Sequence, residues 1–142
     1  MEKALLMFLL TLPALVFAQA DAIVGKWKTD GGKSHIEIYE KDGEFHGKIV
    51  WLREPLNEDG KPKTDKNNPD ESKRNRSLKG LALLSSFEYE GDNEWQEGEI
   101  YDPESGKTYS CVITLESDDT LDVRGYIGVS WLGRSTTWTR VK

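Results

Sequence analysis

Apolar and polar residues alternate with a period of two through most of the chain after residue 22, in short runs separated by turn-forming residues. Such alternation predicts half-buried β-strands, and no long stretch shows the 3.6-residue period of an amphipathic helix. Because the runs follow one another as hairpins, we expect an all-β fold, a small antiparallel up-and-down barrel of about 8–9 strands, whose closure removes exposed sheet edges. The predicted strands cover residues 23–29, 34–41, 44–52, 82–90, 94–101, 107–115, 120–128 and 134–141.

The clearest predicted hairpin joins residues 34–41 to residues 44–52 through Asp42-Gly43, a dipeptide that favours a two-residue type I′ turn. Pairing Lys41 with Glu44 sets the register and separates an apolar inner face from a polar outer face. A slip by one residue would reverse these faces. The predicted inner residues are Ile36, Ile38, Phe45, Ile49 and Trp51, and the predicted outer residues include His35, Glu37, Tyr39, His46 and Lys48.

Residues 53–80 interrupt the alternation with a long charged loop inside the predicted domain. The loop has no aromatic residue, and a connection of this length in a compact domain is typically either functional or disordered. Its segment 65–70 is rich in side chains that cap turns. The carboxylates of this segment leave a calcium site open as an alternative, although their spacing is not that of an EF-hand.

The first 20 residues are predicted to be a secretory signal peptide and not part of the fold. An apolar run over residues 4–17 follows a lysine, and small residues stand at 18 and 20. The run is too short and too broken by proline for a membrane span. We expect cleavage after Ala20, or alternatively after Ala18, leaving residues 21–142 as one exported domain, periplasmic or secreted, with no stable membrane insertion.

Charge, cysteine content and histidine positions indicate which partners, disulfides and metal sites to expect. The formal net charge is −6, so the chain lacks the basic character expected for binding nucleic acid or anionic lipid. The single cysteine, Cys111, cannot form an internal disulfide, and we expect a buried, unreactive thiol. His35 and His46 fall on the predicted outer face, so we predict no metal ligand and no cofactor.

Gly25 and Trp27 in the first predicted strand, with Trp138 and Arg140 in the last, resemble the lipocalin signature. In that superfamily the tryptophan closes one end of the barrel and the late arginine packs over its ring, a favourable cation–π arrangement. The resemblance therefore implies a barrel closed at the end where Trp27 lies.

Residues 23–141 as a whole resemble a bacterial family of exported proteins described as domain of unknown function 2147 (DUF2147). That resemblance implies a calycin-like β-barrel in the cell envelope and brings no established activity, substrate or cofactor. The matching residues are Gly25-Lys26-Trp27, Asn68-Pro69-Asp70, Arg74, Arg76, Gly80-Leu81, Gly98 to Pro103, Gly106 to Tyr109, Leu121 to Gly128, Gly133-Arg134 and Trp138 to Arg140.

A possible binding site emerges around the glycine-rich connection between the last two predicted strands. Arg124 and Arg134 stand at its two ends, where both could reach one mouth of the barrel, whereas alternation places Ile127 on the same face as Leu121 and Val123. Guanidinium groups bind carboxylates and phosphates bidentately, and Phe87 and tryptophans would supply apolar walls. The predicted ligand-binding residues are Arg74, Arg76, Arg124, Tyr126, Arg134, Trp51 and Trp131.

An alternative for each arginine is a structural ion pair with a loop carboxylate such as Asp65 or Asp70. The chain contains no catalytic motif known for nucleophiles, zinc proteases or phosphate-binding loops. We therefore predict no catalytic residue, and an enzyme using Arg124 and Glu99 is the third hypothesis. The carboxylate pair Glu97 and Glu99 is expected to point at water.

Two non-enzymatic functions follow from these patterns. In the favoured one, an exported barrel binds a small amphipathic or anionic molecule in its interior or at its mouth. In the other, a cell-envelope interaction module has a solid barrel, and its long charged loop contacts a protein or a cell-wall polymer. The sequence identifies no particular protein partner.

Overall fold

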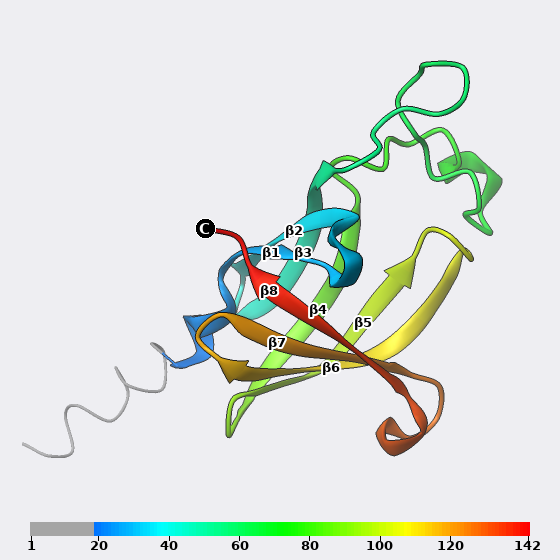
Figure 1. The fold of residues 1–142 in the computed structure, drawn as a ribbon. Coiled ribbons are helices and arrows are strands. Elements are labelled where there is room, and N and C mark those ends of the chain that lie inside the picture. Colours follow the sequence, from blue (N-terminus) through cyan, green and yellow to red (C-terminus); the bar gives the residue numbers. More distant parts are fainter. Residues whose placement is uncertain (1–18) are drawn as a thin grey trace, which may run out of the picture.

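Eight antiparallel strands follow one another around a closed barrel in the computed structural model, which describes residues 19–142 (Figure 1). Each strand pairs with the next, and the last returns to the first, so the predicted up-and-down all-β barrel is confirmed. Residues 1–18 of the predicted signal peptide lie outside the described part. The strands are β1 (Gly25–Lys28), β2 (Ser34–Lys41), β3 (Glu44–Leu52), β4 (Ala82–Gly91), β5 (Glu94–Asp102), β6 (Lys107–Ser117), β7 (Thr120–Tyr126) and β8 (Arg134–Arg140).

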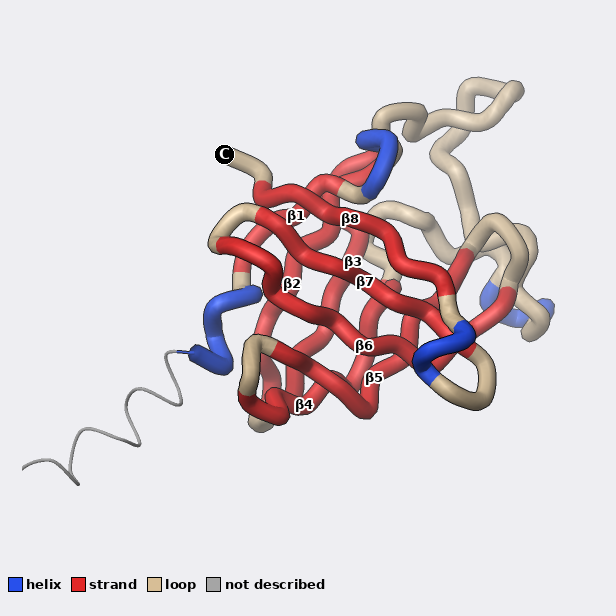
Figure 2. The backbone as a smooth tube through the Cα atoms, turned by 60° about the horizontal axis from the view of Figure 1, so that its bottom comes forward, coloured by secondary structure: helices blue, strands red, loops and turns tan. Residues whose placement is uncertain are grey.

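Four short 3-10 helices lie in the connections and at the N-terminal side of the described chain (Figure 2). Among the described residues, no helix is long and apolar enough to cross a bilayer. The helices are η2 (Asp21–Ile23), η3 (Asp30–Gly32), η4 (Glu71–Lys73) and η5 (Ser130–Leu132).

The two ends of the barrel differ in the length of their connections. At one end, the closed end, lie the tight β2–β3, β4–β5 and β6–β7 turns and η2. The other end, the open end, has the β1–β2, β5–β6 and β7–β8 connections and the long loop over residues 53–81. Figure 1 shows the long loop and η5 at the opposite side of the barrel from η2.

The predicted β2–β3 register is confirmed over most of the hairpin. Lys41 pairs with Glu44 and Ile36 with Ile49, and the inward isoleucines are buried. A bulge next to His35 then shifts the pairing by one residue. Because side chains alternate across a strand, this shift turns Trp51 outward, where it is 42% exposed, so its predicted inward position was wrong.

Aromatic and branched aliphatic side chains fill the barrel from the closed end to its middle. Three of the largest buried side chains are Trp27, Trp95 and Phe87. The Phe87 ring lies directly against the backbone of Gly98, where a Cβ would come within 2.4 Å of it. The rest of the core comprises Ile23, Ile36, Ile38, Phe45, Ile49, Leu81, Leu84, Cys111, Ile113, Leu121, Val123 and Trp138.

Burial also decides the state of the single cysteine. Cys111 is fully buried among these apolar side chains. Desolvation raises the pKa of its thiol to about 12, so the reactive thiolate is scarce at neutral pH. A buried, unreactive thiol is what the sequence predicts.

Plain alternation along β5 would put Glu97 and Glu99 on the face of Trp95, but an irregularity in the β5–β6 pairing between Trp95 and Gly98 changes this. Glu97 has a φ of 64° and Ser86 in the facing strand a φ of 63°, both in the left-handed region. The extra residue leaves Gly98 inside the barrel and both Glu97 and Glu99 exposed. The two glutamates therefore do not share the face of Trp95.

At the closed end, the indole of Trp27 is sealed between the N-terminal segment and the last strand. Its Nε1 donates a hydrogen bond to the carbonyl of Ile23 at 2.9 Å. The guanidinium carbon of Arg140 lies 4.2 Å from the centre of the Trp27 ring. The cation–π contact implied by the lipocalin signature is therefore present.

Arg140 also ties three segments of the closed end together through backbone carbonyls. Its guanidinium donates to Asp118 at 2.8 Å, to Val24 at 3.2 Å and to Ala22 at 2.8 Å. The signature glycine, Gly25, has a φ of 137° and lies so close that an added Cβ would be 2.9 Å from Arg140 Nη1. Glycine is needed there for both reasons.

Candidate functional site

A cavity of about 1070 Å³ opens at the open end of the barrel, beyond the packed core. Trp138 and Leu52, with Leu83 on the neighbouring strand, contribute to its apolar floor and walls. Thr136 adds a hydroxyl on the same inward face of β8 as Trp138. The other apolar residues that line it are Ile49, Leu56, Leu78 and Pro103.

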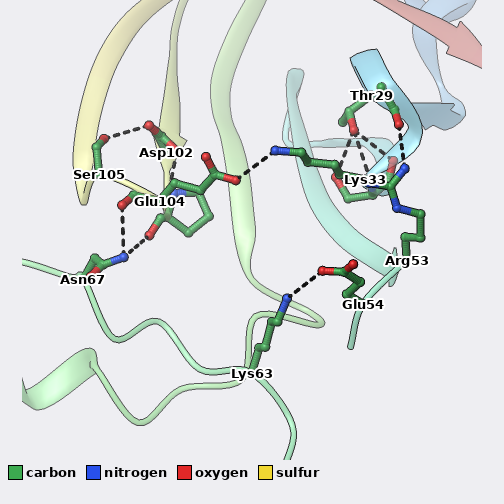
Figure 3. A network of polar contacts seen from close by, with 12 residues as sticks. Thr29, Lys33, Arg53, Glu54, Lys63, Asn67, Asp102, Glu104 and Ser105 are labelled. Carbon is green, nitrogen blue, oxygen red and sulfur yellow. Dashed lines mark hydrogen bonds and ion pairs between the residues drawn. The ribbon is translucent and has the colours of Figure 1, made fainter. Parts of the chain in front are cut away.

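Charged side chains of both signs surround this cavity (Figure 3). Lys33 beside η3 and Glu104 in the β5–β6 turn form an ion pair of 3.4 Å. Lys63 and Glu54, both in the long loop, form another of 3.8 Å. Because the Lys33 and Glu104 side chains are 66% and 77% exposed, their pair adds little stability and can rearrange around a ligand.

The long loop is joined to the neighbouring connections at the rim. The Asn67 side-chain amide donates to the carbonyls of Pro103 and Glu104, at 3.0 Å each. Arg53 Nη1 donates to the carbonyl of Gly31 at 3.0 Å, which links the start of the long loop to the β1–β2 connection. These bonds hold the rim of the cavity together across three connections.

Asp65 is a fully buried carboxylate that fastens the long loop to the barrel. Its Oδ1 accepts a hydrogen bond from the Tyr101 hydroxyl at 2.7 Å, and its Oδ2 accepts one from the Asn68 amide at 2.7 Å. Arg76 pairs with Oδ2 at 3.6 Å. The structural ion pair, the alternative considered for each arginine, is therefore the arrangement observed for Arg76.

Burial and the contact with Asp65 change the pKa of Tyr101. Desolvation, followed by the hydrogen bond to Asp65 and the charge of that carboxylate, raises the pKa of Tyr101 from 10.0 to about 12. The folded state therefore favours the neutral phenol. Its contribution to stability is present below pH 10 and is lost as the pH rises toward 12.

Replacing Tyr101 by phenylalanine is expected to flatten the alkaline stability profile between pH 10 and 12. Urea denaturation at a series of pH values in that window, on the wild type and Tyr101→Phe, measures the difference. All other titratable groups are the same in both proteins, so their effects cancel. Parallel profiles for the two proteins would contradict the assignment.

The segment for which a calcium site was an alternative uses its carboxylates within the protein. Asp65 is engaged as described, and Asp70 accepts hydrogen bonds from the backbone and hydroxyl of Ser72 at 3.0 and 2.7 Å. Within residues 19–142, no group of three or more His, Cys, Asp or Glu side chains is arranged to hold a metal ion. The histidines are on the outer face, His35 stacked on Trp51 at 4.3 Å.

The predicted arginine pair at the β7–β8 connection lies outside the cavity. Arg124 projects from the outer face of β7, where it donates to the Ser135 hydroxyl at 2.9 Å and to the Trp131 carbonyl at 3.1 Å. Arg134 and Tyr126 are not among the lining residues either. Ile127 is 75% exposed because β7 ends at Tyr126, whereas Leu121 and Val123, which were expected to share its face, are buried.

The remaining predicted binding residues are dispersed. Arg74 donates to the Asn68 carbonyl at 2.7 Å, and Arg76 lines a smaller cleft of about 360 Å³ beside the long loop. Trp51 lies on the outer surface and Trp131 at the exposed tip of the β7–β8 connection. Phe87, expected as a cavity wall, is part of the buried core. The structure thus does not gather the seven residues into one pocket.

The cavity is instead lined by residues that the sequence reasoning did not select. Leu52 is the last residue of β3 and Leu83 the second residue of β4, on either side of the long loop. Thr136 precedes Trp138 by two positions. Alternation places Thr136 on the inner face, so a signal existed. The alternation does not indicate how far along the barrel the core side chains extend and where the cavity begins.

An eight-stranded up-and-down barrel, closed by Trp27 beneath Arg140 and hollow at its other end, is a lipocalin-like barrel. The family model described as "Uncharacterized protein conserved in bacteria (DUF2147)" matches residues 25–140. The chain therefore belongs to the DUF2147 family, as the sequence resemblance implies.

One solved structure similar to this chain is described as "Protein HP1028 from the human pathogen Helicobacter pylori belongs to the lipocalin family". The two chains are 28% identical, with a TM-score of 0.74 over 84% of this chain and 83% of that one. The comparison with curated proteins found no match.

Proposed function

We propose that this protein is an exported, non-enzymatic barrel that binds a small amphipathic molecule in the cavity at its open end. The observation that supports this most directly is the lining: an apolar floor including Trp138, Leu52 and Leu83 beneath a charged rim. Ligand pockets typically combine largely apolar walls with a few polar groups that orient the ligand. Eight-stranded barrels of the lipocalin kind are wide enough to hold one small ligand.

The rim indicates what sort of head group would fit. Lys33, Arg53 and Lys63 stand among several acids, including Glu54 and Glu104. A head group with hydrogen-bonding or zwitterionic character matches this mixture better than a simple anion. An anionic ligand has less support, because Arg124 and Arg134 lie away from the cavity.

Export is part of the proposal and is supported by the signal-peptide pattern of residues 1–20. The two expected cleavage positions differ in what they would do to the contacts of Ala20. Ala20 packs against the core, and its carbonyl accepts a hydrogen bond from Trp95 Nε1 at 3.0 Å. Cleavage after Ala18 retains this contact, whereas cleavage after Ala20 removes it.

Filling the cavity is expected to abolish binding without disturbing the fold. Thr136→Trp should weaken uptake of an apolar fluorophore by about tenfold or more, equivalent to about 1.4 kcal/mol of binding free energy. Thr136 lines the cavity, whereas Thr137 next to it points to the other face of β8. Thr137→Trp is therefore the matched control and should bind within about twofold of the wild type.

Native mass spectrometry and organic extraction of the purified protein accompany this titration. A co-purified small molecule present in the wild type and lost in Thr136→Trp would support the proposal. No bound molecule and no uptake of any probe by the wild type would overturn it. Equal binding by the two tryptophan variants would place the ligand elsewhere.

The interaction module is a second candidate because the barrel is packed solid over its closed half and the long loop is anchored by Asp65 and Asn67. An ordered, charged loop is a surface suited to a protein or cell-wall partner. The cavity is the feature that this candidate does not require. Absence of ligand uptake, together with partner capture lost on Glu58→Lys/Asp59→Lys, would favour it.

A further inference from the structure

The β7–β8 connection exposes four large apolar side chains within six residues. Ile127 is 75% exposed, Val129 43%, Trp131 74% and Leu132 66%. We refer to these four residues as the apolar tip. Single exposed apolar side chains are common on soluble proteins, but a contiguous group of them typically marks a contact surface.

The exposure of the apolar tip is built into the structure of the connection. Arg124 on the outer face of β7 donates to the Trp131 carbonyl at 3.1 Å and to Ser135 at 2.9 Å. Gly133 packs so closely on β7 that an added Cβ would lie 2.3 Å from the Gly125 carbonyl oxygen. These contacts hold the connection against β7, and none of the four apolar side chains lines the cavity.

Charge around the apolar tip differs from that of the chain. The net charge of the whole sequence is −6, yet no Asp or Glu occurs after Asp122. Arg124 and Arg134 flank the apolar tip in the sequence, and Asp122 lies beside Arg124, because both contact the Ser135 hydroxyl. Apolar side chains flanked by arginine, with a tryptophan among them, suit the interface of a bilayer, where the rings and methyl groups enter the acyl boundary and guanidinium groups meet phosphates.

We propose that the apolar tip inserts into the interfacial layer of a bilayer that contains anionic phospholipid, as a shallow and reversible contact. The β7–β8 connection and the long loop lie at the same end of the barrel (Figure 1). Insertion of the tip therefore turns the mouth of the cavity toward the membrane. This inference goes beyond ligand binding and does not depend on it.

Vesicle co-sedimentation tests the proposal, using protein expressed from its full sequence, with the N-terminus of the recovered form established by intact mass. The vesicles are phosphatidylcholine with about 30% phosphatidylglycerol, compared with phosphatidylcholine alone. The wild type should partition into the anionic vesicles. The double variant Trp131→Ser/Leu132→Ser should lose about tenfold or more in partition coefficient, because both side chains would leave the acyl boundary.

Two further variants separate the components. Trp51→Ser removes an exposed tryptophan remote in sequence from the apolar tip and should partition within about twofold of the wild type. Arg134→Gln should reduce partition into anionic vesicles and leave the phosphatidylcholine result unchanged, because it removes only a charge. Circular dichroism confirms that each variant keeps the β-sheet signal.

Several results would overturn the proposal. The first is failure of the wild type to co-sediment with anionic vesicles. The second is equal partition of the wild type and the Trp131→Ser/Leu132→Ser variant. A third is a concentration-dependent dimer, without vesicle binding, that the double variant abolishes, because the apolar tip would then contact a second copy of the chain.

Discussion

Trp27→Ala is expected to lower the free energy of unfolding by about 3–5 kcal/mol, the range measured for large aromatic side chains removed from a core. The indole is fully buried, donates a hydrogen bond to Ile23 and lies under the Arg140 guanidinium. Removal of the indole leaves a void at the closed end. It also leaves the Arg140 guanidinium without its aromatic contact to Trp27. Equilibrium denaturation followed by circular dichroism measures the loss.

Two companion variants make this result interpretable. Trp27→Phe keeps a ring beneath Arg140 but loses the hydrogen bond to Ile23, so it should fall between the wild type and Trp27→Ala. Trp131→Ala removes the same side chain from a site that is 74% exposed and should change stability by less than about 0.5 kcal/mol. Similar losses for Trp27→Ala and Trp131→Ala would refute the role of Trp27 in closing the barrel.

Asp65→Ala is expected to cost about 2–4 kcal/mol, because the Tyr101 hydroxyl and the Asn68 amide both lose their acceptor in one step. The carboxylate is fully buried, and Arg76 is its only ion-pair partner among the described residues. The loss should be concentrated in the long loop. Hydrogen exchange should rise over residues 53–80 well before the barrel strands respond, and denaturation gives the total.

Asp59→Ala provides the control within the same loop, since Asp59 is exposed. It should change stability by less than about 0.5 kcal/mol and leave hydrogen exchange unaltered. A double-mutant cycle of Asp65→Ala with Tyr101→Phe should show coupling, because the two side chains share a hydrogen bond of 2.7 Å. Additive losses would mean that this bond does not anchor the loop.

Sequence reasoning succeeded where the pattern reports on neighbouring residues. The turn at Asp42-Gly43 and the alternation on either side were enough for the β2–β3 register, because a hairpin is closed by its own turn. The closed end followed from Gly25, Trp27 and Arg140, whose implied contact the structure shows. The burial of Cys111 was likewise predicted, from the apolar residues on the same face of its strand.

Sequence reasoning failed where one extra residue or a change of direction intervened. The bulge next to His35 reversed the face of Trp51, and period-two alternation carries no mark of such an insertion. The β7–β8 connection was expected to bring Arg124 to the mouth, yet the arginine bonds Trp131 and Ser135 on the outside. The binding role predicted for these residues has no direct support from the cavity.

The chain alone determined an all-β barrel with alternating faces and a long charged loop, since these depend on turn chemistry and on the period of the strands. The closed end under Arg140 came from the resemblance to the lipocalin signature, and the structure shows the implied contact. Tertiary structure decided where the core ends, and therefore that the cavity is lined by Leu52, Leu83 and Thr136. Tertiary structure also decided that the side chains of the apolar tip do not line the cavity. Depth within a barrel and the path of a connection arise from contacts between distant segments, which local alternation does not encode.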